Sequence, residues 1–141
     1  MKIVIQRDYH RNGQLREQTP LRGGVRHGMV REWHRNGVLA AEEPYRNGLR
    51  HGLARAWDEQ GKLLGKFKMV HGTGTVRSWH DNGRLRQELP MVDGLFCGRG
   101  RSWHRDGTLM SDHLALYNQL VTPAEYRRAV AKDKRLPKLR G

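Results

Sequence analysis

Apolar and polar residues alternate along most of the chain in short runs that glycines interrupt at regular intervals. Residues 31–39 read REWHRNGVL, and closely similar segments stand at residues 77–85 and 101–109. Alternation with a period of two is typical of β-strands, and regularly spaced glycines are typical of the turns between them. The pattern therefore predicts many short antiparallel strands rather than long helices.

The aromatic residues reveal a repeat of 22 to 24 residues. Trp33, Trp57, Trp79 and Trp103 stand 24, 22 and 24 residues apart, and Tyr9 precedes Trp33 by 24. A glycine recurs in the same register, at Gly13, Gly37, Gly61, Gly83 and Gly107. Repeats of this length build stacked architectures. We expect an all-β fold, an elongated solenoid-like meander of about five stacked β-hairpins with about ten antiparallel strands, followed by a short C-terminal helix.

Each repeat contains two turns marked by glycine. In the first turn, Gln60 precedes Gly61 where other repeats have asparagine or aspartate, and Gln60 tolerates a positive φ poorly. A three-residue loop with only the glycine left-handed is therefore preferred, and it pairs Trp33 with Leu39 across the hairpin. The second turn is two residues shorter at residues 71–74 (HGTG), so the flanking strands should be preserved.

The repeat stops at Tyr117, which divides the chain into a repeat domain at 1–116 and a capping helix with a basic tail at 117–141. Thr122, Pro123 and Glu125 predict a capped helix near residues 123–133. Its apolar side should lie against the last hairpin and close the stack. Alternatively, the basic side chains of this segment dock a partner, and these are Arg127, Arg128, Lys132, Lys134, Arg135, Lys138 and Arg140.

The arginines supply the main chemical pattern, since one stands two residues before each aromatic. Side chains at i and i+2 of a strand share a face, so each guanidinium can lie beside an aromatic ring. Rungs two strands apart are separated by about 9–10 Å, which would make a row of about 40 Å. The arginines either shield the aromatics and pair with acids such as Glu42 and Glu88, or form a linear cationic surface. The candidate binding residues are Arg7, Arg31, Arg55, Arg77, Arg101, Trp33, Trp57, Trp79, Trp103, Arg127 and Arg128.

The overall charge favours an anionic ligand, because 27 basic residues face 14 acidic ones and the formal net charge is +13. A single cysteine, Cys97, cannot form an internal disulfide and suits a reducing compartment. The first residues lack the apolar core of a signal peptide, and no stretch is long enough to span a bilayer. These features predict a cytoplasmic location.

Metal binding and catalysis are disfavoured by the same repeat. The histidines recur once per hairpin on rungs about 9–10 Å apart, which cannot converge on zinc at about 2.0–2.1 Å. The glycine segments HGTGT and CGRGRS lack the lysine of a phosphate-binding loop. Cys97 and His104 lack an orienting third group. We therefore expect no enzyme activity, no catalytic residue, no cofactor and no metal site.

The motif W-H-x-N-G-x-L followed by Y-R-N-G-L-R-H-G resembles the MORN repeat, and more closely its bacterial variant, found in YwqK-type antitoxins. The resemblance covers about residues 3–116 and implies a non-catalytic scaffold built from twisted sheets of hairpins. It favours an antitoxin-like or immunity-like module that binds a protein. Since a basic partner would be repelled, that protein should be acidic, for example a toxin. The alternative is binding of nucleic acid or an anionic membrane phospholipid through the arginine and aromatic surface.

Overall fold

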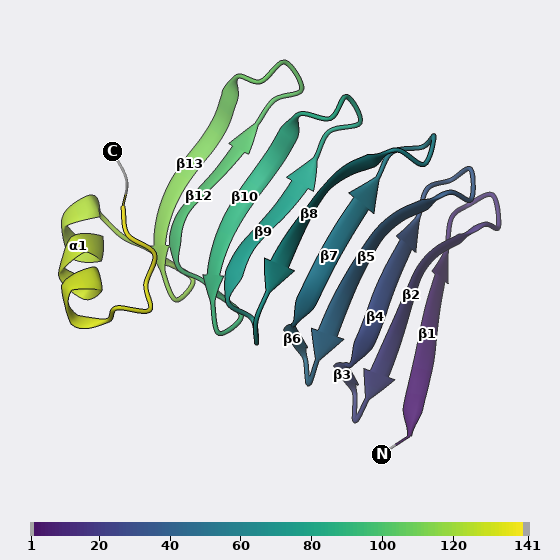
Figure 1. Cartoon of the computed structure of the whole chain (residues 1–141), viewed down its shortest axis with the longest axis horizontal. Coiled ribbons are helices and arrows are strands. Elements are labelled where there is room, and N and C mark those ends of the chain that lie inside the picture. Colours follow the sequence, from purple (N-terminus) through teal and green to yellow (C-terminus); the bar gives the residue numbers. More distant parts are fainter. Residues whose placement is uncertain (1, 140–141) are drawn as a thin grey trace. The chain divides into compact units, whose positions relative to one another are not determined.

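The computed structural model describes residues 2–139, which form β-hairpins and one helix (Figure 1). Ten strands have six to eight residues, and the sequence prediction of an all-β hairpin fold is confirmed. They are β1 (Ile3–Tyr9), β2 (Leu15–Arg22), β4 (Gly28–Trp33), β5 (Leu39–Arg46), β7 (Gly52–Trp57), β8 (Leu63–Met69), β9 (Gly74–Trp79), β10 (Leu85–Val92), β12 (Gly98–Trp103) and β13 (Leu109–Leu116). Four two-residue strands lie beside turns, namely β3 (Val25–Arg26), β6 (Leu49–Arg50), β11 (Leu95–Phe96) and β14 (Gln119–Leu120). The helix α1 spans Pro123–Lys132.

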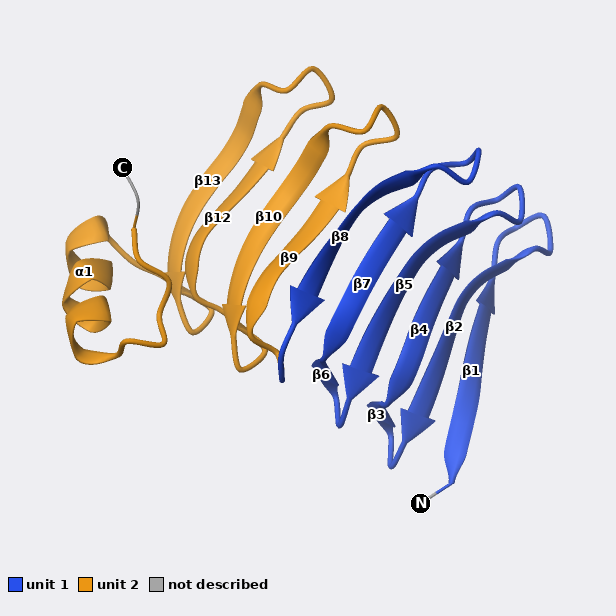
Figure 2. Cartoon of the chain, viewed as in Figure 1, with its two compact units in different colours: residues 1–71 blue, residues 72–141 orange. Residues whose placement is uncertain are grey.

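The chain divides into two compact units, residues 1–71 and residues 72–141 (Figure 2). The first contains a sheet in the order β1-β2-β4-β5-β7-β8, with β3 on β2 and β6 on β5. In the second, β10 pairs with β9, β11 and β12, and the sheet continues through β13 to β14. The division falls inside the shortened turn, and both flanking strands are present as predicted, β9 at six residues like its counterparts and β8 at seven, one fewer than its counterparts. The helix and tail belong to the second unit.

The hairpin turns have the predicted three-residue form. The His34 N–H donates to the Val38 carbonyl at 2.9 Å, and the Gly37 N–H donates to the His34 carbonyl at 3.0 Å. Gly37 is left-handed at φ 88, whereas Asn36 is not. Trp33 lies opposite Leu39, and the corresponding aromatic and leucine residues are paired in the other four hairpins. A single glycine per turn therefore fixes the register of each hairpin.

The ladder between neighbouring hairpins is shorter than the ladder within a hairpin and is interrupted, since two of its pairs lie beside the second turn, as between β2 and β3, and two lie further along the strands. Between β2 and β4, only Glu17 with Glu32 and Gln18 with Arg31 are paired. The β5–β7 and β10–β12 ladders are also two pairs long, whereas the ladder between β4 and β5 has six. Side-chain bonds at the turns add to this interrupted backbone connection between repeats.

At the first turns, histidine and asparagine side chains bind the backbone of the following repeat. The Nε2 of His34 donates to the Trp57 carbonyl at 2.9 Å, and the Nδ2 of Asn36 donates to the Glu59 carbonyl at 3.0 Å. Equivalent bonds join His10 to Trp33, Asn12 to Arg35, His80 to Trp103 and Asn82 to Arg105. The histidines and asparagines of the repeat motif thus hold adjacent hairpins together.

At each second turn, one side chain accepts a hydrogen bond from the backbone N–H of the residue 20 positions later. That later residue has a positive φ. The Nδ1 of His51 accepts from the His71 N–H at 2.9 Å, and the φ of His71 is 46. The other acceptors are His27 for Asn47, Thr73 for Asp93 and Cys97 for Tyr117. Cys97 therefore occupies the position that histidine has in the first unit.

The core of the first sheet places small residues opposite large ones on one face. Ala54 lies opposite Phe67 and Gly52 lies opposite Met69, and all but Gly52 are buried. Tyr45 is also buried and lies opposite Gly28. Because the glycines and Ala54 leave room opposite the large side chains, this face of the sheet can pack closely and its large residues are buried.

The helix forms as the sequence predicted. The Thr122 hydroxyl accepts from the Glu125 N–H, the Glu125 carboxylate accepts from the Thr122 N–H, and Pro123 occupies the first turn. Tyr126 is fully buried, and burial raises the pKa of its phenol to about 12. Its hydroxyl donates to the Pro137 carbonyl at 2.5 Å. This bond ties the tail to the helix.

The helix contacts more than the last hairpin, against which the sequence placed it. Ala129 and Val130 pack on a cluster of Val92, Cys97 and Leu136. Val92 ends β10, so the helix also covers the end of the β9–β10 hairpin. Arg135 then holds the tail through the carboxylates of Asp93, at 3.0 Å, and Asp133, at 3.1 Å. Arg140, which was also assigned to the basic tail, lies outside the described residues.

Some glycines lie against a proline and others face open space, so replacing them by alanine should lower the unfolding free energy by different amounts. Gly52 has φ 120, and a Cβ there would lie 2.9 Å from Pro44 Cγ, whereas at Gly61, with φ 83, no atom lies within 4 Å. Gly61→Ala should cost about 1–2 kcal/mol of unfolding free energy through backbone strain alone. Gly52→Ala should cost about 1–3 kcal/mol more through overpacking. Urea unfolding of both variants measures the difference, and equal losses would contradict it.

The histidine at the second turn predicts pH-dependent stability. Partial burial lowers the pKa of His51 from 6.5, and His71, Arg46 and Lys68 lower it further. Because its Nδ1 accepts a hydrogen bond, the folded protein holds His51 neutral. Its contribution is complete above the unfolded pKa of 6.5 and is lost as the pH falls below that value.

Asparagine can accept the same hydrogen bond without titrating, so His51→Asn should reduce the fall in melting temperature between about pH 7.5 and about pH 5.5. His104→Asn is the matched control, because no hydrogen bond of the His104 side chain is found among residues 2–139. An unchanged pH dependence in His51→Asn would refute this role.

Candidate functional site

The register of the first sheet places a row of polar residues across all six long strands. Directly opposed residues of antiparallel strands share a face, and the pairing is continuous from β1 to β8. The row consists of Arg7, Gln18, Arg31, Glu42, Arg55 and Lys66. We call this the arginine row. Three of the five arginines predicted from the sequence therefore lie side by side on one face.

Glu42 is the single acid of the arginine row. Its carboxylate lies 3.0 Å from Arg31 Nε and 3.9 Å from Arg55 Nη2. Arg7 donates to Gln18 Oε1 at 3.1 Å, and Lys66 has no ion pair among the described residues. The predicted pairing with acids is thus observed at Arg31 and Arg55, yet four cations share one carboxylate. The row keeps an excess of positive charge.

The second sheet carries a shorter and better balanced row. Arg77, Glu88, Arg101 and Asp112 lie opposite one another. Arg77 Nε lies 3.0 Å from Glu88, and Arg101 Nε lies 3.7 Å from Asp112. Two of the predicted arginines are therefore matched by two acids here.

The predicted tryptophans lie beside the arginines and are half-buried in all four repeats. The guanidinium of Arg55 lies 6.0 Å from the centroid of the Trp57 ring, which is within the range of a cation–π contact. Leu63, opposite Trp57, is exposed. The tryptophans thus connect the arginine face to an apolar margin near the first turns.

Internal contacts engage most of the acidic residues. Asp58 and Asp106 accept hydrogen bonds within their turns, and Glu125 caps the helix. Eight further acids form ion pairs with arginine, namely Glu17, Glu42, Glu43, Asp81, Glu88, Asp93, Asp112 and Asp133. No lysine within residues 2–139 forms an ion pair. The surplus of positive charge is therefore carried by exposed side chains, including the helical residues Arg127 and Arg128.

A cluster around Tyr45 lies on the opposite face of the first sheet and was missed from the sequence. The guanidinium groups of Arg26 and Arg50 lie 5.2 and 5.5 Å from the ring centroid, and Arg26 also donates to the phenol oxygen at 3.1 Å. Glu43 lies 2.7 Å from Arg50, and Glu17 lies 3.8 Å from Arg26. The recurring R-H-G of the second turn was the available signal. Since both arginines are paired, this cluster stabilises the sheet.

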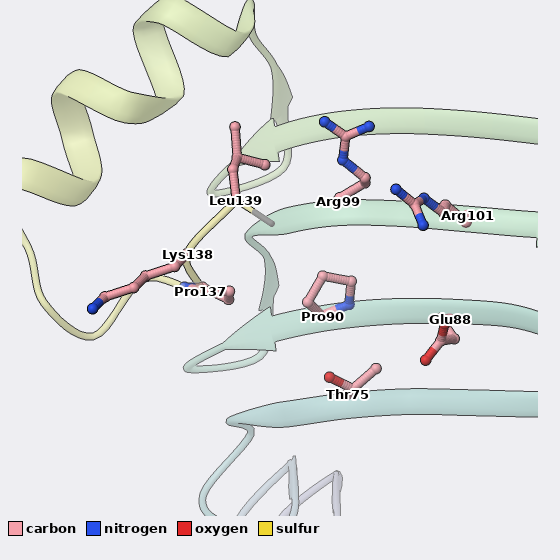
Figure 3. Close-up of a pocket in the computed structure, with 8 residues that line it drawn as sticks. All are labelled: Thr75, Glu88, Pro90, Arg99, Arg101, Pro137, Lys138 and Leu139. Atoms are coloured by element: carbon pink, nitrogen blue, oxygen red, sulfur yellow. The ribbon is translucent and has the colours of Figure 1, made fainter. Parts of the chain in front are cut away.

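The second unit contains a pocket of about 220 Å³ (Figure 3). Its lining comes from three strands and the tail, and comprises Thr75, Glu88, Pro90, Arg99, Arg101, Pro137, Lys138 and Leu139. The Nε atoms of Arg99 and Arg101 are buried and donate to no acceptor among the described residues. The sequence indicated Arg101 but not the pocket, because the tail forms one wall.

Residues 2–139 hold no group of three or more histidine, cysteine, aspartate or glutamate side chains suited to a metal ion. Cys97 is fully buried, and this burial raises the pKa of its thiol, which makes it a poor nucleophile. Within the same residues, no helix has the length and apolar character needed to cross a membrane.

The hairpins share one register and one type of turn, and side chains in the turns bind the backbone of the next repeat. The protein is therefore a tandem β-hairpin repeat protein. The family model of the MORN repeat variant matches residues 26–47 and 73–93, each of which contains part of such a hairpin. The chain therefore contains two matched MORN-type repeats, and MORN repeats are in general non-enzymatic binding modules. A search of curated proteins and a search of solved structures each find no match.

Because the tryptophans are half-buried, replacing one by alanine should lower the unfolding free energy by an intermediate amount. Full burial of a tryptophan makes its replacement by alanine cost about 3–5 kcal/mol. Trp57 is half-buried, so Trp57→Ala should lower the unfolding free energy by about 2 kcal/mol. Tyr9 occupies the same repeat position on an edge strand and is 59% exposed. Tyr9→Ala should therefore cost less than about 1 kcal/mol in the same urea titration. Equal losses at the two positions would contradict the assignment.

Proposed function

We propose that this protein is a non-catalytic cytoplasmic scaffold that binds an acidic partner protein through the face of the arginine row. The observation that carries this proposal is the charge of the row, in which Glu42 faces three arginines and Lys66. An acidic surface would replace the missing counter-charges. Lys68 extends the same face, since it is separated from Lys66 by two positions on β8.

Apolar side chains on the same face favour a protein ligand over a nucleic acid. Leu53 shares the face of Arg55 on β7 and is 42% exposed, and Leu63 at the end of β8 is 46% exposed. Protein interfaces combine such apolar contacts with charged margins. Base stacking would need a free aromatic face, and at Trp57 the guanidinium of Arg55 lies over the ring.

The second unit contributes Arg77, Arg101 and their tryptophans, Trp79 and Trp103, to the proposed set of binding residues. Arg127 and Arg128 are exposed on α1 and add further positive charge. An acidic toxin held on these surfaces would make the protein an antitoxin-like or immunity-like module. Such a module acts by covering its partner, so it requires no catalytic group.

The test removes charge from the arginine row in a variant with a matched control. The test variant is Arg7→Gln, Arg31→Gln and Arg55→Gln, and the control is Arg11→Gln, Arg35→Gln and Arg46→Gln, which lie outside the row and are exposed. Both lose three charges in the first unit. Exposed ion pairs contribute about 0–1 kcal/mol each, so both variants should remain folded by circular dichroism.

Affinity purification from the source cells with nuclease treatment, followed by mass spectrometry, should recover an acidic protein with the wild type and the control but not with the test variant. Titration of the purified partner then gives the affinities. Retained binding in the test variant, or equal loss in both variants, would contradict the proposal. A nucleic acid would instead be identified by two results together. The ligand would be lost on nuclease treatment, and the slope of log affinity against log salt would fall by about 2–3 units in the test variant.

A further inference from the structure

We propose that the pocket of the second unit is a subsite for one carboxylate side chain of the partner, bound by Arg99 and Arg101. This inference rests on the proposed function, since it assumes a partner with acidic side chains. It assigns a recognition role to a particular cavity, in addition to the general attraction by the arginine row.

The two arginines are held side by side on one strand. They stand two positions apart on β12 and therefore share a face. Asp112 on β13 lies 3.2 Å from Arg99 Nη1 and 3.7 Å from Arg101 Nε, the latter being too long for a hydrogen bond. One carboxylate thus restrains both guanidinium groups and leaves donors free.

Both arginine side chains are partly exposed, at 30% and 39%, and line the pocket, so their guanidinium groups suit an oxygen ligand. Arg99 Nε and Arg101 Nε are buried, and neither has an acceptor within the described part of the chain. A buried donor without an acceptor costs about 1–3 kcal/mol, and more when it is charged. A carboxylate is planar and carries two acceptor oxygens, so it suits adjacent guanidinium groups through charge-assisted hydrogen bonds.

The charge around the pocket selects a carboxylate over a phosphate. Glu88 lines the pocket and Asp112 adjoins it, so the two arginines are already opposed by two acids. The side chain of Lys138 extends away from both arginines in Figure 3. A doubly charged phosphate would be repelled by Glu88 more strongly than a singly charged carboxylate.

The size and walls of the pocket indicate a side chain rather than a free metabolite. Its volume of about 220 Å³ is smaller than the roughly 300–1,000 Å³ of typical small-molecule pockets. Pro90, Pro137 and Leu139 supply apolar walls, and Thr75 supplies a hydroxyl at the edge. The methylene groups of a glutamate would contact the prolines while its carboxylate reaches the arginines.

The C-terminal cap is part of this subsite. Pro137 lies over Gly98, where an added Cβ would be 3.3 Å from Pro137 Cγ, and its carbonyl accepts from Tyr126. Arg135 fixes the preceding turn through Asp93. The helix therefore positions the tail residues that form one wall of the pocket.

The experiment titrates the full-length protein with N-acetyl-glutamate amide at constant ionic strength and follows the arginine Nε–Hε signals by NMR. Arg99→Lys and Arg101→Lys assign the two signals. We expect both signals to shift saturably, and inorganic phosphate to bind more weakly. Arg99→Lys keeps the charge but removes the Nε donor, and it should weaken binding about tenfold. Arg86→Lys, on the same sheet outside the pocket, should bind as the wild type does.

Shifts no larger at Arg99 and Arg101 than at the remaining arginines, or tighter binding of phosphate, would overturn the carboxylate subsite. Unchanged Cα shifts across β12 in Arg99→Lys exclude misfolding as the cause of lost binding. The titration uses a small probe and therefore does not depend on the arginine row. If the probe binds but the affinity purification recovers no acidic protein, the proposed function fails while the anion site stands, and the reverse result removes only the subsite.

Discussion

The interrupted ladder between hairpins is the constraint on which the structure depends. The joint between β5 and the next repeat has two pairs in the middle, Glu42 with Arg55 and Ala41 with Ala56, and two more at the second turn, where β6 pairs with β5. The bonds at the two rows of turns supply the remaining restraint, because they lie at opposite ends of the strands. His34 and Asn36 bind one end of the following repeat, and His51 binds at the other. Where all of these bonds are present, as between the second and third repeats, the following repeat is held at the middle and at both ends of its strands.

This arrangement explains why the arginine row lies where it does. Glu42 pairs with Arg31 inside its hairpin and lies opposite Arg55 in the next hairpin, so the row crosses every joint of the first sheet at the ladder between repeats. A charge placed there contributes to packing between repeats and also faces the solvent. The structural and binding interpretations of these arginines are consequently compatible, since Glu42 neutralises part of the row and leaves the rest for a ligand.

The sequence predicted the features that depend on neighbours within one hairpin. The three-residue turn at Gly37, the pairing of Trp33 with Leu39 and the capping box of Thr122 and Glu125 each follow from local pattern and backbone sterics. It did not predict the roles of His34 or Cys97, because their partners lie 23 and 20 residues away and become neighbours only when hairpins stack. The pocket depends on the tail in addition to three strands, so no single motif encodes it.

The third repeat departs from this chemistry, and the first compact unit ends in its second turn. The third repeat has Asp58 and Gln60 where the first, second and fourth have the histidine and asparagine that bind the following repeat. Asp58 instead accepts from the N–H groups of Gln60 and Lys62 in its own turn, which stabilises that turn alone. The second turn of this repeat is also the shortened one, and it lacks a two-residue strand of its own. Because both kinds of turn are altered in this repeat, its sequence marks the boundary between residues 71 and 72.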